Sequence, residues 1–208
     1  MKKNIRNATI LFTIFILWTA VVCLFDVQKI GPDCSAVGLA TLNSYFHNLT
    51  GVHMTLYTLT DWLGLIPFGV MISFSIIGLF QWFRRKSILK VDRSILTLGG
   101  FYLAVLSVYV FFECYIINYR PVLIDDVLEA SYPSSTTMLV LCVMPTANMQ
   151  LKVRIKNLKL QRICAFFISA FTVFMVLGRL ISGVHWLSDI IGGCLISAAL
   201  IFLYSSIS

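Results

Sequence analysis

Six long apolar runs constrain this chain more than any other feature of its sequence. A helix of about 20 apolar residues crosses the hydrocarbon core of a bilayer. The two shortest runs, the fourth and the fifth, are expected to extend into their neighbouring loops. We therefore predict an all-α polytopic membrane protein, a bundle of about six transmembrane helices that forms a single domain over residues 1–208. The predicted spans are Ala8–Phe25, Trp62–Trp82, Ser94–Asn118, Thr136–Met149, Ile163–Gly178 and Trp186–Tyr204.

Basic residues gather in alternate connections between these runs. Apart from Lys29, Arg120 and Arg179, every lysine and arginine lies before the first run, between the second and third, or between the fourth and fifth. Alternating spans put these three segments on one side of the membrane, and the positive-inside rule makes that side cytoplasmic. Both termini are therefore predicted to be cytoplasmic in a multi-pass protein of the cell membrane. The net charge of +7 then reflects topology and contact with anionic headgroups, and no nucleic-acid partner is predicted.

The cysteines and histidines do not form a metal-binding pattern. The six cysteines are scattered without any C-x-x-C pair, and the three histidines do not cluster. We predict neither a disulfide framework nor a metal site, and no cofactor. The first run follows a basic head as a signal peptide does, but it lacks a small-x-small cleavage site, so we expect an uncleaved helix.

The longest connection, residues 26–61, is expected to lie on the extracytoplasmic side. Within it, residues 37–49 have approximately helical spacing of apolar side chains, which is typical of an amphipathic helix lying in the membrane interface. This segment carries His47, and His53 follows it. Both histidines are interpreted first as surface or interfacial residues, although they share a side of the membrane with the residues described next.

Three ionisable residues stand between the end of the fifth run and the first residues of the sixth, where a membrane protein would ordinarily place inert side chains. They are Arg179, His185 and Asp189. If His185 and Asp189 share a helix, they lie one turn apart on one face. The carboxylate then accepts the Nδ1 proton of the imidazole and leaves Nε2 free as a nucleophile. Arg179 supplies a planar fork of donors suited to phosphate oxygens. Ionisable residues in membrane segments are costly and usually functional, which favours this interpretation over one of simple anchors and caps.

A second group of candidate residues precedes the fourth run. Arg120-Pro121 ends the third run and leaves a guanidinium group at the membrane surface. Pro133-Ser134-Ser135-Thr136 opens the fourth helix, where free backbone N–H groups and small hydroxyl side chains form an anion site. An ordinary loop and helix cap would have the same composition. The segment is therefore a candidate anion site only in combination with Arg179 and His185, which are predicted on the same side of the membrane.

Together these segments resemble the type 2 phosphatidic acid phosphatase superfamily (lipid phosphatases and haloperoxidases), in its integral membrane branch. The family pattern is Lys-x₆-Arg-Pro, then Pro-Ser-Gly-His, then Ser-Arg-x₅-His-x₃-Asp, and the part of this chain that carries the motifs is residues 113–189. The resemblance implies that His185 is a nucleophile that becomes phosphorylated and that Asp189 orients it. It also implies that Arg120, Ser134, Ser135 and Arg179 hold the phosphate.

Four positions depart from the pattern: Ser135 replaces its glycine and Gly178 its leading serine, and two further changes concern residues to which the family assigns a chemical role. Glu113 stands at the lysine position, and Thr136 stands where the family histidine would protonate the leaving group. A positioned general acid contributes roughly 10²–10⁴-fold in rate, and a phosphate leaving group needs it least. We therefore predict a preference for lipid diphosphates, such as a polyprenyl diphosphate, over lipid monophosphates. A second hypothesis is that His47 or His53 folds over the site and supplies the proton. For Glu113 two arrangements remain open: pairing with an arginine of the site, or pointing away from it.

The leading interpretation is an integral membrane phosphatase that hydrolyses a lipid phosphate or diphosphate at the extracytoplasmic face through a phosphohistidine intermediate. The alternative is a catalytically impaired relative that binds lipid phosphate headgroups in a transport or scaffold role, which Glu113 and Thr136 favour. An intact Arg179, His185 and Asp189 favour the enzyme, because a binding protein has no need of an oriented imidazole. An unrelated small transporter is a third possibility, but such proteins carry internal repeats and charges near mid-membrane, and neither is evident.

Overall fold

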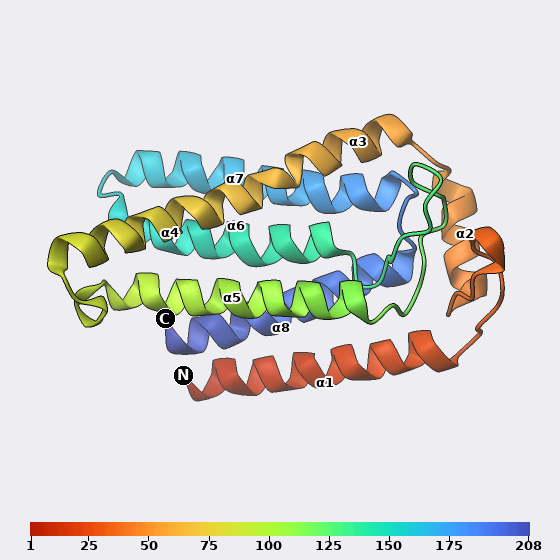
Figure 1. Ribbon diagram of the computed structural model, residues 1–208, viewed down its shortest axis with the longest axis horizontal. Coiled ribbons are helices and arrows are strands. Elements are labelled where there is room, and N and C mark those ends of the chain that lie inside the picture. Colours follow the sequence, from red (N-terminus) through yellow and green to blue (C-terminus); the bar gives the residue numbers. More distant parts are fainter.

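The chain folds into α-helices that run along one long axis (Figure 1). The structure, a computed structural model, describes residues 1–208. Short 3₁₀ turns lie at Pro32–Cys34 and Ile88–Lys90. The helices are α1 (Lys2–Leu24), α2 (Ala40–Thr50), α3 (Met54–Leu63), α4 (Leu65–Arg85), α5 (Arg93–Cys114), α6 (Ser135–Arg154), α7 (Leu158–Ile181) and α8 (Leu187–Ile207).

The outer surface of this bundle is apolar. Large hydrophobic side chains project outward along the helices; Leu17 is 61% exposed, Phe80 64% and Phe166 69%. Such a surface is compatible with lipid and not with water. Five helical segments are long and apolar enough to cross a membrane: Lys2–Leu24, Met54–Arg85, Arg93–Cys114, Leu158–Ile181 and Leu187–Ile207. The predicted all-α, polytopic membrane fold is confirmed.

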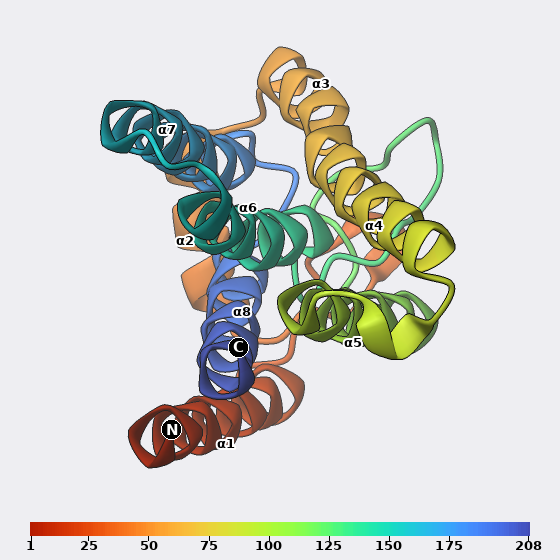
Figure 2. The ribbon, with the colours of Figure 1, turned by 90° about the vertical axis from the view of Figure 1, so that its left-hand side faces the viewer.

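The fourth predicted span, α6, differs from the other five because it lies at the centre. Viewed along the bundle axis, α4, α5, α7 and α8 surround it (Figure 2). Two of its buried polar side chains are paired inside the protein: Thr146 donates to the carbonyl of Cys142 at 2.8 Å, and the Gln150 amide donates to the hydroxyl of Tyr204 at 2.7 Å. A central helix can therefore carry more polar residues than a lipid-facing one, which explains why α6 is not among the strongly apolar segments.

Several helix boundaries differ from the prediction. The second span is broken at Gly64, so that α3 and α4 are separate helices. The third span ends at Cys114, which leaves Asn118 in the following connection. The fourth and fifth spans extend beyond their apolar cores, as expected for runs too short to cross a bilayer. These changes matter for the site, because α3 and residues 115–134 contribute to it.

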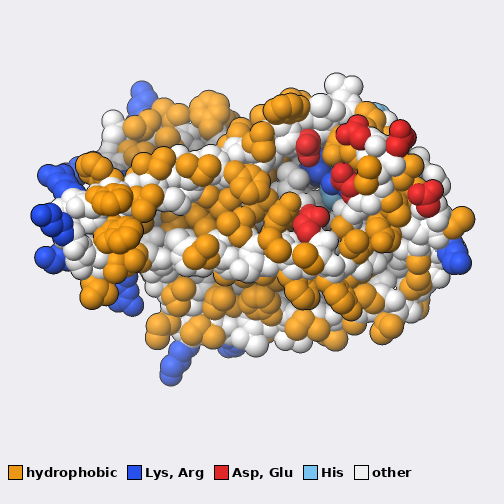
Figure 3. All heavy atoms as spheres, in the orientation of Figure 1, with side chains coloured by type: hydrophobic (Ala, Val, Ile, Leu, Met, Phe, Trp, Pro, Cys, Tyr) orange, Lys and Arg blue, Asp and Glu red, His pale blue; other side chains and the backbone are white.

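The two ends of the bundle differ in charge. The N- and C-termini lie at one end together with the α4–α5 and α6–α7 connections (Figure 1). Lysine and arginine side chains gather at that end, whereas acidic side chains gather near the other (Figure 3). The basic end is the one whose sequence segments carry the predicted topology signal. We call the opposite end, formed by α2, residues 115–134 and the α7–α8 junction, the site end.

Candidate active site

Three segments that are far apart in the sequence meet at the site end. The backbone N–H of Ser134, just before α6, donates to the carbonyl of Asp189 at 3.0 Å. The indole N–H of Trp186 donates to the carbonyl of Tyr119 at 2.7 Å. These bonds join the connection 115–134 and the start of α6 to the start of α8. The segments that carry the predicted site residues are therefore in contact.

Two glycines in the α7–α8 segment let other parts of the chain approach it closely, a side chain in one case and backbone in the other. A Cβ atom added to Gly178 would lie 2.7 Å from the Thr60 Cγ2 atom on α3, closer than packed atoms allow. Gly183 has φ +68°, and a Cβ there would lie 1.9 Å from the carbonyl oxygen of Gly51. The serine that the family pattern has at position 178 would thus clash with α3. Glycine there brings α3 against α7 beside Arg179.

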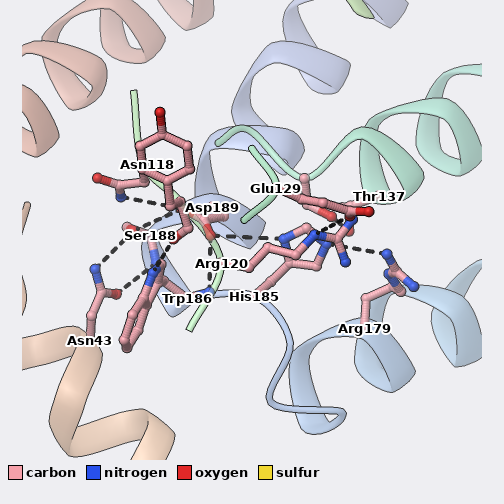
Figure 4. A network of polar contacts seen from close by, with 12 residues as sticks. Asn43, Asn118, Arg120, Glu129, Thr137, Arg179, His185, Trp186, Ser188 and Asp189 are labelled. Carbon is pink, nitrogen blue, oxygen red and sulfur yellow. Dashed lines mark hydrogen bonds and ion pairs between the residues drawn. The ribbon is translucent and has the colours of Figure 1, made fainter. Parts of the chain in front are cut away.

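His185 lies between two charged partners. Its Nε2 atom is 3.3 Å from the Nη2 atom of Arg179, and its Nδ1 atom is 3.8 Å from the Oδ2 atom of Asp189 (Figure 4). A guanidinium group only donates, so Nε2 accepts and the ring proton resides on Nδ1, facing the carboxylate. The two residues do not share a helix: His185 precedes α8, and Asp189 lies in its first turn. The loop at Gly183 brings the ring to the carboxylate instead.

Burial and neighbouring cations lower the pKa of His185. The residue is 3% exposed. Burial is the main cause, because it disfavours the charged imidazolium, and the positive charges of Arg120 and Arg179 act in the same direction. The pKa of His185 therefore lies well below the usual 6.5. The imidazole is neutral near pH 7, which is the form that can act as a nucleophile.

Asp189 is fully buried and held by several donors. Its Oδ2 atom accepts the backbone N–H of Trp186 at 2.9 Å, which closes the first turn of α8. Its Oδ1 atom accepts from the hydroxyl of Ser188 at 3.3 Å and from the amide of Asn118 at 3.5 Å. These contacts fix the carboxylate beside the imidazole. His185 Nδ1 has no hydrogen-bond partner, so a small movement of the ring toward Asp189 would complete the pair.

Asn43 on α2 supports the same network from another direction. It is fully buried, and its carbonyl oxygen accepts the backbone N–H of Ser188 at 3.1 Å. Its amide donates to the carbonyl of Gly38 at 2.8 Å and to the hydroxyl of Ser188 at 2.9 Å. The predicted amphipathic segment is thus a helix, but it caps the N-terminus of α8 as well as presenting polar residues outward.

We predict that Asn43→Ala destabilises the folded protein by about 1–3 kcal/mol, because it leaves the buried backbone N–H of Ser188 without an acceptor. Unfolding in detergent, followed by circular dichroism, measures the change. The matched control is Asn48→Ala, since Asn48 is exposed on the same helix. Equal unfolding midpoints for the two variants would contradict this role of Asn43.

The two arginines flank the ring of Tyr57. The guanidinium carbons of Arg120 and Arg179 lie 5.6 and 4.9 Å from the centre of that ring. Arg120 is 8% exposed and Arg179 1%. The Nη1 atom of Arg120 and the Nε atom of Arg179 have no hydrogen-bond partner. Two buried cations are therefore held side by side with donors to spare, an arrangement suited to an anion.

Each arginine also contacts a carboxylate that the sequence did not single out. Arg120 Nε lies 3.1 Å from Glu129 Oε2, and Arg179 Nη1 lies 3.5 Å from Asp61 Oδ1. Tyr57 and Asp61 are four residues apart on α3, so they present one face to the site. The sequence pattern indicates Tyr57 and Asp61 only weakly as site residues. Their place beside the arginines depends on the position of α3, which is set by the helix break at Gly64 and by contacts with α7.

A cavity of about 460 Å³ opens beside the arginines. Figure 3 shows it as a hollow with acidic side chains around it and basic atoms inside. Thr136 and Ser135, in the first turn of α6, line it, and so does Glu113. The residues that line it with charged or hydroxyl groups are Asp61, Tyr109, Glu113, Arg120, Glu129, Ser135, Thr136 and Arg179.

Not all of the predicted site residues face the cavity in the way the sequence suggested. Ser134 is fully buried, and its hydroxyl donates to that of Thr137 at 3.0 Å, so only Ser135 of the two predicted serines lines the cavity. Glu113 lines the cavity without an ion pair to either arginine. This differs from both arrangements left open by the sequence, since Glu113 neither pairs with an arginine nor points away from the site.

None of the three histidines lines the cavity: His185 lies behind Arg179, and the other two lie elsewhere at the site end. The ring of His47 packs against the indole of Trp186, with centres 5.5 Å apart. The Nε2 atom of His53 lies 2.9 Å from the carbonyl oxygen of Thr50, and His53 precedes α3. The hypothesis that one of them folds over the site receives no support from this arrangement.

Comparison with known proteins bears on the family and the fold. The model of the PAP2 superfamily matches residues 112–208, which include α6, the α7–α8 junction and α8. No curated protein matches the chain significantly. Among solved structures, a transmembrane PAP2 type phosphatidylglycerolphosphate phosphatase from Bacillus subtilis has a similar fold, with a TM-score of 0.60 and 20% identity over 96% of this chain and 94% of that one. In this multi-pass membrane protein, the sequence match to the PAP2 superfamily thus covers residues 112–208, slightly less than half of the chain.

Proposed function

We propose that this protein is an integral membrane phosphatase that hydrolyses a lipid phosphate or diphosphate through a phosphohistidine intermediate. The observation that carries the proposal is the neutral imidazole of His185, whose Nε2 accepts from Arg179 while its Nδ1 faces Asp189. It lies beside a cavity lined by two buried arginines. A protein that only binds lipid headgroups does not require such an oriented imidazole.

In this mechanism the phosphate first binds to the guanidinium groups of Arg120 and Arg179, which takes the Arg179 donor away from Nε2. The freed Nε2 lone pair attacks phosphorus, and the bond from phosphorus to the leaving oxygen breaks. The phosphorylated ring is cationic, and the carboxylate of Asp189 stabilises it through the Nδ1 proton. Water then attacks phosphorus, inorganic phosphate leaves, and the electron pair of the broken bond returns to Nε2. The arginines stabilise the charge on the phosphoryl oxygens in both steps.

The charge distribution favours one orientation in the membrane. The basic end carries the termini and the connections rich in lysine and arginine, and the positive-inside rule makes it cytoplasmic. The site end, with the cavity, would then face the extracytoplasmic side. With the six native cysteines replaced by serine, a cysteine introduced at Asn48 should react with an impermeant maleimide added to intact cells, whereas one introduced at Lys86 should not.

The direct test is release of inorganic phosphate by the detergent-purified protein from a polyprenyl diphosphate and from phosphatidic acid. Release is expected from the wild type and not from His185→Ala. The leaving-group argument also predicts faster release from the diphosphate, because Thr136 cannot protonate an alkoxide. Equal release by wild type and His185→Ala would refute the assignment of the nucleophile.

The low pKa of His185 predicts that activity persists to a lower pH than an ordinary histidine nucleophile would allow. An ordinary histidine loses its neutral form as the pH falls through about 6.5, but His185 keeps it to lower pH because burial and two cations oppose protonation. We therefore expect kcat/KM, measured from about pH 5 to 8, to hold through 6.5 and fall only below it. Arg120→Gln removes one of the cations and should move the acid limb upward. If kcat/KM of the wild type already fell at a pH above 6.5, burial and the two cations would not be controlling the protonation of His185.

The alternative function, binding of lipid phosphate headgroups without turnover, is favoured by a different observation. Glu129 and Asp61 already occupy one side of each arginine, and Glu113 adds a negative charge to the same cavity. If the purified protein binds both lipids but releases no phosphate above the His185→Ala background, this alternative replaces the enzyme.

A further inference from the structure

The cavity beside the arginines has an unusual balance of charge for a phosphate site. Two cations line it, Arg120 and Arg179, and three carboxylates line it with them, Asp61, Glu113 and Glu129. No lysine lines it. A phosphate monoester carries up to two negative charges near neutral pH. The cavity as a whole is therefore not a simple receptor for an anion.

The charges are arranged by depth. The side chains of Arg179 and Arg120 are 1% and 10% exposed, whereas those of Glu129 and Asp61 are 38% and 56% exposed. Figure 3 shows the same order, with acidic atoms around the hollow and basic atoms within it. An anion would bind deep, and a rim of carboxylates would surround whatever is attached to it.

The buried arginines provide a separate sign that a ligand binds here. Arg120 Nη1 and Arg179 Nε have no hydrogen-bond partner, although both side chains line the cavity and are at least nine-tenths buried. Unpaired buried donors are costly, and a bound phosphate would satisfy them. The same phosphate would compete with Glu129 and Asp61 for the guanidinium groups. Those carboxylates would lose their partners, and Glu113 has no ion-pair partner at the outset.

A ligand that satisfies both sets of groups must carry a positive charge close to its phosphate. We propose that the substrate is a lipid phosphate with an ammonium group near the phosphate, and that Asp61, Glu113 and Glu129 bind the ammonium. This proposal rests on the proposed function for the phosphate position. The cavity of about 460 Å³ is large enough for a phosphate together with a small amino-bearing headgroup.

The glutamate at position 113 then has a physical role. A lysine there would add a cation for phosphate, but it would repel an ammonium group on the substrate. The acid reverses that preference and disfavours lipid phosphates whose headgroups lack a positive charge. Specificity thus arises from repulsion of one class as well as attraction of the other.

The experiment compares sphingosine 1-phosphate with its N-acetylated form, in which a small neutral amide replaces the ammonium group. We expect the wild type to have a kcat/KM roughly tenfold or more higher for the free amine. Glu113→Gln should lower kcat/KM for the amine and raise it for the acetylated lipid, and Asp61→Asn and Glu129→Gln should shift the ratio in the same direction. A folding defect would instead lower both values together.

The matched control is Asp126→Asn, which removes an exposed carboxylate from the same connection as Glu129 without touching the cavity. It should leave the ratio unchanged. Equal kcat/KM for the two lipids in the wild type, or a ratio that none of the three substitutions alters, would overturn the proposal.

Binding to His185→Ala separates failure of this inference from failure of the proposed function. Dissociation constants for the same two lipids, measured on this variant, need no turnover. Suppose that His185→Ala binds the free amine more tightly than the acetylated lipid and that adding Glu113→Gln abolishes this difference. That result would support ammonium binding by the carboxylates even if neither lipid is hydrolysed. Equal dissociation constants would overturn it even if both lipids are hydrolysed.

Discussion

Thr136→His is expected to raise the hydrolysis of lipid monophosphates by roughly 10²–10⁴-fold, the usual contribution of a positioned general acid. Thr136 lies in the first turn of α6, lines the cavity and is only half-buried, so an imidazole has room to point toward a bound phosphate. The departing alkoxide would then receive a proton as the bond to phosphorus breaks. Steady-state phosphate release from phosphatidic acid measures the gain.

The same substitution should change the hydrolysis of a polyprenyl diphosphate far less, because a phosphate leaving group requires little protonation. Thr136→Asn is the control, since it introduces a polar side chain that cannot donate a proton in this way. The same change in the rates for both lipids, or an equal gain in rate from asparagine, would contradict proton transfer by the introduced histidine. Position 136 would then affect the rate through the size or polarity of its side chain.

Asp189→Asn is expected to lower kcat by roughly 10²–10⁴-fold while the protein still binds lipid phosphate. The comparable change in a Ser-His-Asp triad costs about 10⁴-fold through the wrong tautomer. Here the carboxylate accepts from Trp186, Ser188 and Asn118 and faces His185 Nδ1. An amide would present a donor to some of these groups, and it could not stabilise the cationic phosphorylated ring.

A double variant distinguishes orientation of His185 from general support of the fold. Residues that act as a unit are strongly non-additive, so His185→Ala combined with Asp189→Asn should be no slower than His185→Ala alone. Unfolding midpoints of all three variants check the fold. A further large loss in the double variant would mean that Asp189 contributes independently of the imidazole.

The sequence predicted most of the fold because the bilayer restricts what an apolar run can do. Five of the six predicted spans are strongly apolar helices, and their approximate positions follow from length alone. The central position of α6 was not predictable from this pattern. Its inward polar groups, such as Gln150, are paired by tertiary contacts that no local pattern records.

The candidate site was predictable where spacing is local and not where it depends on packing. Arg179, His185 and Asp189 lie within one short segment, and the structure brings their side chains together. Asn43 and Tyr57 reach the site because α2 and α3 fold over it, which depends on contacts with α8 and α7. The direction of the Ser134 side chain depends on a single hydrogen bond to the hydroxyl of Thr137 in α6. Side-chain direction at a helix start is decided by such local competition.

The account depends above all on a covalent bond between phosphate and His185. We would incubate the purified protein with a lipid labelled in its terminal phosphate, quench the reaction within one turnover, and divide the sample between acid and alkali. A phosphohistidine predicts label on the protein that acid removes and alkali preserves, and no label on His185→Ala. Continued phosphate release without labelled protein at any quench time, or equal labelling of His185→Ala, would contradict the account.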